Sequence, residues 1–339
     1  MAKKHGSFGI SMSQTKWTKS RSSSSTFNPS LIQQSYDVIH VHNVHGWYLN
    51  LPAIAYLSTK MPVYWTLHDM WALCGQSAHT DSDTITNGLF ETSNPNLYPS
   101  YFFNNAFINR LIKRKIYQSS NFKIITSNRW LKEKALKTVL KPKIRAIIPN
   151  FISSEFFQKR DDFINRRFRV LIVGDNINNN EYKGYSDFKI LSGMKYSYDV
   201  EFVAIGAPFS QVDERVSIKQ RMSVQDLASF MRKSDILVLA STHETEPLVV
   251  LEALASGMSV VAFNVGGIKD IARELSLVYV TCDRSVESLY AELDSAIGSR
   301  CSEVVQSLAH SNLKIIKQRY NVTAHMNSLR KLYSDDMAL

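Results

Sequence analysis

Short apolar runs alternate with stretches of helical periodicity along most of this chain. Runs of four to seven mostly apolar residues have the length of buried strands, and they predict strands at 38–41, 63–67, 122–126, 144–148, 169–174, 200–206, 236–240 and 260–263. Apolar residues spaced as on one face of a helix predict helices at 105–117, 130–140, 223–232, 247–256 and 285–297. This alternation implies parallel, doubly wound sheets.

The alternation also divides the chain. Residues 1–30 are rich in Lys, Ser and Thr and show no period, so we expect them to be disordered. The composition turns polar between residues 149 and 166, which favours a domain boundary there. The expected parts are an N-terminal domain at 31–151, a C-terminal domain at 152–320, and a last helix at 321–339 that packs back towards the N-terminal domain. Residues 74–100 are polar and irregular and predict a loop.

The segment from 236 to 257 carries the most specific local signal. Pro247 suits the first turn of a helix, where its missing N–H has no partner to lose, and Gly257 suits the helix end. Glu244 therefore lies on the loop after a strand, and Glu252 lies about a turn and a half into the next helix. Open α/β sheets bind ligands at that edge.

The start of that helix suits a diphosphate. The N–H groups of Leu248, Val249 and Val250 have no helical partners, and such groups bind anions. The carboxylates of Glu244 and Glu252 lie on either side and can accept hydrogen bonds from sugar hydroxyls. The segment therefore predicts a nucleotide-sugar as ligand.

Further motifs occur in a definite order between about residues 37 and 333. They are Tyr64-Trp65-Thr66-Leu67-His68-Asp69-Met70-Trp71, Ser127-Asn128-Arg129-Trp130-Leu131, Ile148-Pro149-Asn150, Lys183-Gly184, and the Glu244-to-Glu252 segment with the later Val265-Gly266-Gly267-Ile268. Together they resemble the family-4 retaining glycosyltransferases of GT-B fold, in the branch that builds capsular and exopolysaccharides.

The resemblance implies an α/β chain with two doubly wound, Rossmann-like domains facing across a cleft. It implies transfer of a sugar, with retention of configuration, from a nucleotide-diphosphate-sugar to a glycan or lipid-linked acceptor in surface polysaccharide synthesis. It implies no metal and no cofactor besides the nucleotide-sugar substrate. The family's first strand–helix unit is expected to be missing. The alternative is a truncated, catalytically weak or inactive protein that acts as a binding partner.

The resemblance also assigns roles to single residues. It implies that Glu244 contacts the donor sugar, Glu252 the ribose hydroxyls, and His68 the donor sugar and reacting centre. Lys183 would neutralise the charge that grows on the leaving diphosphate. The remaining candidates for donor binding surround these residues, and they are Pro247, Leu248, Val249, Gly174 and Asp175.

Two departures from the family pattern are expected to weaken donor binding. Glu246-Pro247 stands where the family has Phe-Gly or Pro-Phe-Gly, which removes one N–H and adds a negative charge near the diphosphate. Tyr182 stands where the family has an arginine, so one of two phosphate-binding cations is absent.

Histidines and cysteines give no sign of a metal site. His40 and His42 share one strand face whereas His45 lies past the strand end, so we predict no metal there. Three widely spaced cysteines, Cys74, Cys282 and Cys301, favour neither a disulfide framework nor zinc.

Charge is concentrated in the first half of the 339 residues. Residues 1–150 hold 18 Lys and Arg against 6 Asp and Glu, whereas the remainder is nearly balanced. This excess predicts binding to an anionic membrane surface, with Lys113, Arg114 and Lys115 prominent. No recognisable nucleic-acid module accompanies it, so we expect no nucleic-acid partner. Without a signal-peptide core or a spanning apolar run, we expect a cytoplasmic protein, peripheral on the inner face of the plasma membrane.

Overall fold

The structure is a computed structural model that describes residues 36–46, 50–92, 104–160, 167–175, 177, 181–206, 214–299 and 303–337. The expected disordered segment at 1–30, the missing strand–helix unit and Cys301 therefore lie outside the described residues. By its contacts, the stretch Tyr36–Leu339 is one compact unit.

Four parallel strands form the first sheet, in the order β1-β2-β5-β6. Their bounds are β1 Ile39–His42, β2 Val63–Leu67, β5 Lys123–Thr126 and β6 Ile144–Ile147. The connecting helices are α1 Leu51–Ser58, α2 Ala106–Gln118 and α3 Arg129–Leu136. Because sequential strands are neighbours throughout, each connection advances the sheet by one strand in the same direction.

The strand β2 is buried on both of its faces. Trp65 packs edge-on against Tyr117 of α2 and against Phe122. Tyr64 points the other way, packs against the tilted ring of Tyr333 and donates a hydrogen bond of 2.6 Å to Asp336. Both contacts of Tyr64 lie in α10 (Val322–Met337), which therefore covers this face. Burial from two sides explains why β2 reads as a continuous apolar run.

Six parallel strands form the second sheet, in the order β12-β11-β10-β7-β8-β9. Their bounds are β7 Phe168–Val173, β8 Val200–Ile205, β9 Val216–Lys219, β10 Ile236–Leu239, β11 Ser259–Ala262 and β12 Val278–Val280. The chain starts in the middle with β7, builds outwards to β9, and then returns to β10 on the other side of β7. The point between β7 and β10 is the topological switch point of this sheet.

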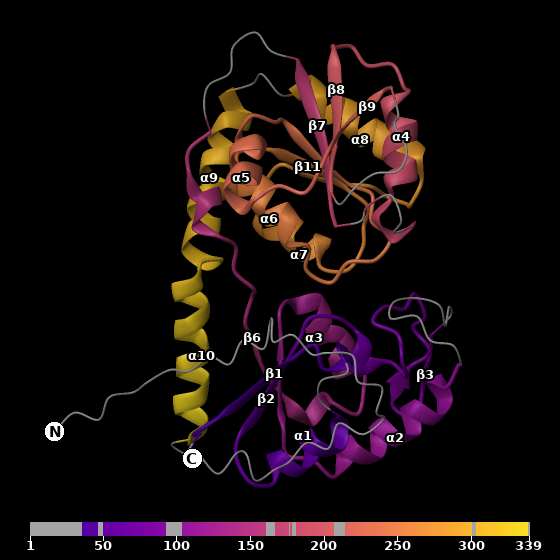
Figure 1. The fold of residues 1–339 in the computed structure, drawn as a ribbon, viewed down its shortest axis with the longest axis vertical. Helices are drawn as coiled ribbons and strands as arrows, with labels where there is room; N and C mark the ends of the chain where they lie inside the picture. Colours follow the sequence, from indigo (N-terminus) through magenta and orange to yellow (C-terminus); the bar gives the residue numbers. More distant parts are fainter. Residues whose placement is uncertain are drawn as a thin grey trace, which may run out of the picture. The chain divides into compact units, whose positions relative to one another are not determined.

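Helices cover both faces of the second sheet (Figure 1). Their bounds are α4 Tyr185–Ser192, α5 Val224–Arg232, α6 Leu248–Ala255, α7 Ile268–Glu274, α8 Val286–Ser299 and α9 Glu303–Arg319. Figure 1 shows α4 and α8 together on one side and α5, α6 and α9 on the other, in agreement with their contacts. Short 3-10 helices occur at Val44–Gly46, Trp71–Leu73, Lys141–Lys143, Ser154–Phe157 and Glu181–Lys183.

The predicted strands and helices coincide with observed ones to within two residues, apart from one helix end. The helix expected at 130–140 ends at Leu136, because the hydroxyl of Thr138 bonds back to the carbonyl of Ala135 and Pro142 follows in a 3-10 turn. The division into domains at 151 and 152 stays a prediction.

The loop expected at 74–100 contains a β-hairpin that we did not predict. Its strands, β3 (Ile85–Thr86) and β4 (Leu89–Phe90), are joined by Asn87 and Gly88, both with positive φ. Asn-Gly between two short strands is the strongest local signal for such a turn, and it was readable in the sequence.

Candidate functional site

The loops after β7 and β10 meet at the switch point of the second sheet. The amide of Thr242, after β10, donates to the carbonyl of Tyr182, after β7, at 2.9 Å. Gly184 adopts a left-handed conformation with φ of +68°, and a Cβ there would lie 2.1 Å from the carbonyl oxygen of Ala240. Only glycine fits this turn, so the Lys183-Gly184 motif is held hard against the end of β10.

This packing brings Lys183 and Glu244 together. The ammonium of Lys183 lies 2.8 Å from Oε1 of Glu244, with 33% of the Lys183 side chain and 13% of the Glu244 side chain exposed. Both residues were candidates from the sequence, but the contact between them was not predicted. A charge-assisted bond of this length orients both side chains at the edge where α/β sheets bind ligands.

Two glycines support the backbone of the Glu244 loop. Gly266 has a φ of +52°, and a Cβ on it would lie 1.6 Å from the carbonyl oxygen of Glu244. The amide of Gly267 donates to the carbonyl of Thr245 at 3.0 Å. The Val265-Gly266-Gly267-Ile268 motif therefore fits closely beneath the loop that carries Glu244, and any side chain at 266 would displace that loop.

Asn128 of the first half also holds this loop. Its Oδ1 accepts from the amide of Leu131 and caps α3, while its Nδ2 donates to the carbonyl of Thr245 at 2.7 Å. The amide of Trp130 donates to Asp270 of α7 at 2.7 Å. The Ser127-to-Leu131 motif was recognised in the sequence, but its contact with the Glu244 loop could not be read from it.

Glu252 lies where the strand–loop–helix pattern placed it, half-buried in α6. Burial raises the pKa of its carboxyl to about 7. No side-chain hydrogen bond or ion pair to Glu252 occurs among the described residues. This carboxylate can therefore accept hydrogen bonds from ligand hydroxyls.

The start of α6 offers fewer N–H groups than expected. Pro247 stands just before the helix, which begins at Leu248. The amide of Val250 donates to the carbonyl of Pro247 at 3.0 Å, so the expectation of a free Val250 N–H is wrong. A tight first turn consumes that donor, which leaves Leu248 and Val249 as the candidates at this helix start.

Glu246 is held by a partner outside the donor loop. Its carboxylate accepts from both the side chain and the backbone amide of Asn150, in the segment that follows β6. Burial raises its pKa to about 7, against the opposing effect of the Asn150 bonds. Glu246 was expected to act only as a repulsive charge near the diphosphate, and Asn150 gives it a structural partner instead.

His68 is hydrogen-bonded to His42 and not to the Lys183–Glu244 pair. Its Nε2 lies 2.8 Å from Nδ1 of His42, and no hydrogen bond or ion pair joins it to either residue of the pair among the described contacts. Burial, with a contribution from His42, lowers the pKa of His68 to about 4. The imidazole is therefore neutral near pH 7.

His40, on the strand β1 with His42, is hydrogen-bonded to α10. His40 bonds to Thr66 at 2.7 Å and to the hydroxyl of Tyr333 at 2.6 Å. Burial, followed by the neighbouring His42, lowers the pKa of His40 to about 3. Within the part of the chain that the structure describes, no group of three or more His, Cys, Asp or Glu residues could hold a metal ion.

The other two candidates after β7 have their own contacts. The amide of Gly174 donates to the carbonyl of Ile205 at 3.0 Å, which continues the ladder past the strand end. Asp175 is exposed and lies 3.6 Å from Arg221. Arg221 is a cation close to this loop that sequence reasoning missed, because no motif marked it.

A polar contact outside the predicted set reaches the same loop. His243 lies 3.1 Å from Asp81, which also pairs with Arg284 at 3.1 Å. Asp81 precedes the hairpin β3–β4, so the hairpin region is bonded to the loop that carries Glu244. No local sequence pattern predicts this contact, because its residues lie far apart in the chain.

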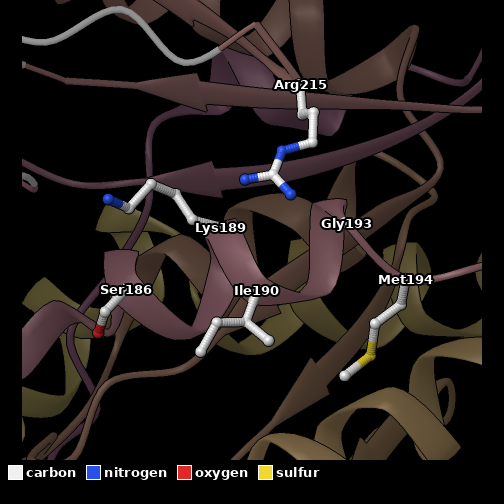
Figure 2. A pocket seen from close by; sticks show the side chains of 6 residues that line it. All are labelled: Ser186, Lys189, Ile190, Gly193, Met194 and Arg215. Atoms are coloured by element: carbon white, nitrogen blue, oxygen red, sulfur yellow. The ribbon is translucent and has the colours of Figure 1, made fainter.

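A separate pocket lies along one face of α4 (Figure 2). It is lined by Ser186, Lys189, Ile190, Gly193, Met194 and Arg215. None of these residues belongs to the predicted donor site.

Comparisons with known proteins agree with this architecture. Residues 210–311 match the family described as Glycosyl transferases group 1. The chain is 24% identical over 257 residues to the putative colanic acid biosynthesis glycosyl transferase WcaC of Escherichia coli K12. That match covers 70% of this chain and 61% of the relative.

Solved structures show the same fold. Sucrose-phosphate synthase of Thermosynechococcus elongatus superposes with a TM-score of 0.65 at 15% identity, covering 89% of this chain and 74% of that one. HepE of Anabaena, in complex with UDP, gives a TM-score of 0.64 at 15% identity, with 88% and 79% covered. The chain thus has an α/β fold of GT-B type, as the sequence predicted.

Proposed function

We propose that this chain is a retaining glycosyltransferase that moves a sugar from a nucleotide-diphosphate-sugar to a glycan or lipid-linked acceptor in surface polysaccharide synthesis. The observation that carries the proposal is the Lys183–Glu244 pair at the switch point of the second sheet. The pair consists of a cation and a carboxylate side by side, and Glu244 lies four residues before α6 begins at Leu248. A nucleotide-sugar presents a diphosphate and hydroxyl groups, which these groups bind.

Each residue has a defined task in this reaction. Lys183 and the amides of Leu248 and Val249 stabilise the negative charge that grows on the diphosphate. Glu244 accepts hydrogen bonds from the donor sugar, and Glu252 accepts them from the ribose. His68, neutral near pH 7, can donate one hydrogen bond to the donor sugar without adding charge.

The chemical step is an exchange of oxygens at the anomeric carbon. The bond from that carbon to the diphosphate oxygen breaks, and the acceptor hydroxyl oxygen bonds to the same face of the sugar. The acceptor's proton passes to the departing diphosphate oxygen, so no protein base is consumed. The protein contributes positioning and charge stabilisation, without metal.

The comparisons support the donor class in this proposal. HepE, of the same fold, is described in complex with UDP and, in another structure, with UDP-glucose. WcaC is named for colanic acid biosynthesis, which is a polysaccharide-synthesis context. We extend the donor class and the polysaccharide context from these proteins to this chain.

We also propose that the chain works at an anionic membrane surface on the cytoplasmic side. The support is the basic excess of residues 1–150, and a lipid-linked acceptor is one of the two acceptor classes proposed above. Among the described residues, no helix has the length and apolar content to cross a membrane. The attachment that we propose is peripheral, through the basic side chains of residues 1–150.

A ligand screen followed by a product assay tests the proposal. Thermal unfolding of the full chain is measured with UDP, GDP and their sugar conjugates, with and without EDTA. A nucleotide at 100 times its Kd stabilises the folded state by about 2.7 kcal/mol. We expect one nucleotide class to raise the Tm, and EDTA to leave that rise unchanged. The matching sugar donor should then release nucleoside diphosphate, and the product should keep the donor's anomeric configuration by NMR.

Glu244→Gln and its control Glu201→Gln make the test specific. Glu201 forms a matched ion pair of 2.8 Å with Arg169 on β7 and β8, away from the switch point. We expect Glu244→Gln to abolish donor turnover and Glu201→Gln to leave it intact. No shift with any nucleotide would refute the proposal. Nucleotide binding without turnover would support the alternative of an inactive binding partner.

A further inference from the structure

Helix α2 is amphipathic, but its charged side chains face the protein interior and its large apolar side chains face outwards. Its inward face consists of buried residues spaced three or four apart, and these are Ala106, Arg110, Lys113 and Tyr117. Its outward face carries large apolar side chains at the same spacing, namely Phe107, Ile108, Leu111 and Ile112, which are 56%, 56%, 42% and 50% exposed. A helix of a globular protein normally turns such a stripe towards the core.

The inward cations fix this orientation. The ammonium of Lys113 donates to the carbonyls of Trp71 and Cys74 at 2.6 and 2.8 Å and lies 3.5 Å from the centre of the Trp71 ring. Arg110 pairs with Glu91 at 3.7 Å. Rotating α2 to bury its apolar stripe would break these bonds. The apolar stripe therefore stays outward as a consequence of how Lys113 is bound.

This geometry corrects one expectation from the sequence. Lys113 was expected to face a membrane together with Arg114 and Lys115, but it is 3% exposed and points into the protein. Arg114 and Lys115 remain exposed, one turn beyond the apolar stripe on the same side of the helix. Along the outward face of α2, the N-terminal part is thus apolar and the part that follows it is basic.

We propose that the outward face of α2, formed by Phe107, Ile108, Leu111 and Ile112, inserts into the headgroup region of an anionic membrane, with Arg114 and Lys115 on the lipid phosphates. Interfacial helices combine an apolar stripe with basic residues in this way. The inference rests on the membrane partner proposed above. It adds insertion of apolar side chains to the electrostatic contact of the basic residues. It does not depend on sugar transfer.

Charge distinguishes a lipid surface from a second copy of this chain. Helix α2 has no acidic residue, and the exposed end of its outward face carries two cations. Pairing two such faces would leave these cations without an acidic partner from α2, whereas anionic phosphates complement them. The neighbouring α1, which packs against α2, adds an exposed tyrosine, Tyr56, with Lys60 over its ring. Aromatic rings and lysines of this kind are favoured at membrane interfaces.

Vesicle partitioning of the full chain tests the inference. Co-sedimentation is measured with phosphatidylcholine vesicles with and without 30% phosphatidylglycerol. We expect binding to the anionic vesicles and little to neutral ones. Leu111→Gln/Ile112→Gln should lower the partition coefficient at least about tenfold. Arg114→Gln/Lys115→Gln should lower it by roughly ten- to thirtyfold at low salt and by less at high salt.

The control is a pair of equally exposed apolar residues on helices elsewhere. Ile190 of α4 and Val304 of α9 are 51% and 65% exposed, and Ile190→Gln/Val304→Gln should leave partitioning unchanged. Brominated lipids should quench the fluorescence of the tryptophan introduced by Ile108→Trp, whereas they should not quench that introduced by Ile190→Trp. All variants should keep the wild-type Tm and nucleotide response.

The outcomes separate the two proposals. Anionic binding that Leu111→Gln/Ile112→Gln leaves unchanged would overturn insertion but keep an electrostatic membrane contact. A wild-type chain that binds no vesicles would overturn both membrane statements without touching nucleotide binding. A concentration-dependent dimer that the same double substitution dissolves, with vesicle binding unaffected, would assign the face to a second copy instead.

Discussion

The ammonium of Lys183 lies 2.8 Å from Oε1 of Glu244, and this bond joins the loops that follow β7 and β10 at the switch point of the second sheet. Each side chain thus sets the direction of the other. In the proposed function Lys183 receives the diphosphate and Glu244 the donor sugar, so this bond would position both side chains before the donor binds. The pair is expected to act as a unit, and its energetics can be measured.

A double-mutant cycle on Lys183 and Glu244 is the first prediction. Losing a hydrogen bond to a charged group costs about 1.5–3 kcal/mol, or roughly ten- to a hundredfold in affinity. Lys183→Ala should weaken donor binding and turnover by that amount, with little loss of Tm. Because Glu244→Ala removes the counter-ion as well, the double variant should lose less than the sum. Calorimetric titration with the nucleotide found by thermal shift provides the affinities, and strictly additive losses would show that the two residues act independently.

Glu252 predicts a pH dependence of donor binding. Its pKa is raised by burial to about 7 from 4.5, and hydroxyl groups bind best to the ionised carboxylate. Nucleoside affinity should therefore increase as the pH rises from about 5.5 to 8. Glu252→Gln should weaken binding by roughly tenfold at pH 8 and flatten the profile. An identical pH profile in the wild type and in Glu252→Gln would exclude this carboxyl as the titrating group.

The same carboxyl predicts the sign of a stability change. An unfolded glutamate ionises near 4.5, whereas folded Glu252 keeps its proton to about 7, so the folded state binds more protons between these values. Its contribution to the free energy of unfolding is therefore present below about 4.5 and falls as the pH rises to 7. Urea unfolding at pH 5 and 7.5 should show a larger drop for the wild type than for Glu252→Gln. A larger drop in the variant would contradict the assignment.

Asn128 allows a matched comparison of two helix caps. Asn128→Ala removes both the α3 cap and the bond to the Thr245 carbonyl, whereas Asn50→Ala removes only the cap of α1. A cap is worth about 1 kcal/mol and the second bond about 0.5–1.5 kcal/mol more. Chemical denaturation should thus show a larger loss for Asn128→Ala, and only that variant should lose nucleotide affinity. Equal losses in both would remove Asn128 from the support of the Glu244 loop.

Lys113 predicts that a buried amino group, whose pKa burial lowers to about 7, holds the segment after His68. Lys113→Met keeps the volume but removes the bonds of Lys113 to the carbonyls of Trp71 and Cys74, of which Trp71 keeps the amide of Cys74 as a donor at 3.4 Å. The loss should cost about 1–3 kcal/mol of unfolding free energy. Lys115→Met, at an exposed position two residues on, should change stability by less than about 0.5 kcal/mol. If the Lys113→Met protein is as stable as the wild type, the free energy that desolvating Lys113 costs equals the stabilisation that its hydrogen bonds contribute.

Periodicity, glycines and motif order let the sequence determine the fold class and the identity of most candidate residues. Buried parallel strands are apolar on both faces, so runs such as Val63–Leu67 can be recognised in the sequence as strands. Glu244 and Glu252 could likewise be placed on a loop and a helix from their neighbours alone. The Asn87–Gly88 turn was equally local, and it was overlooked although its signal was present.

Contacts between distant segments were decided only by the tertiary structure. The Lys183–Glu244 pair spans 61 positions, and the bond from Asn128 to Thr245 spans 117. No local pattern encodes such pairings, because they depend on which loops the strand order brings together. The orientation of α2 is the clearest case, since its apolar stripe predicts an inward face. The bonds of Lys113 to two carbonyls turn that stripe outwards instead.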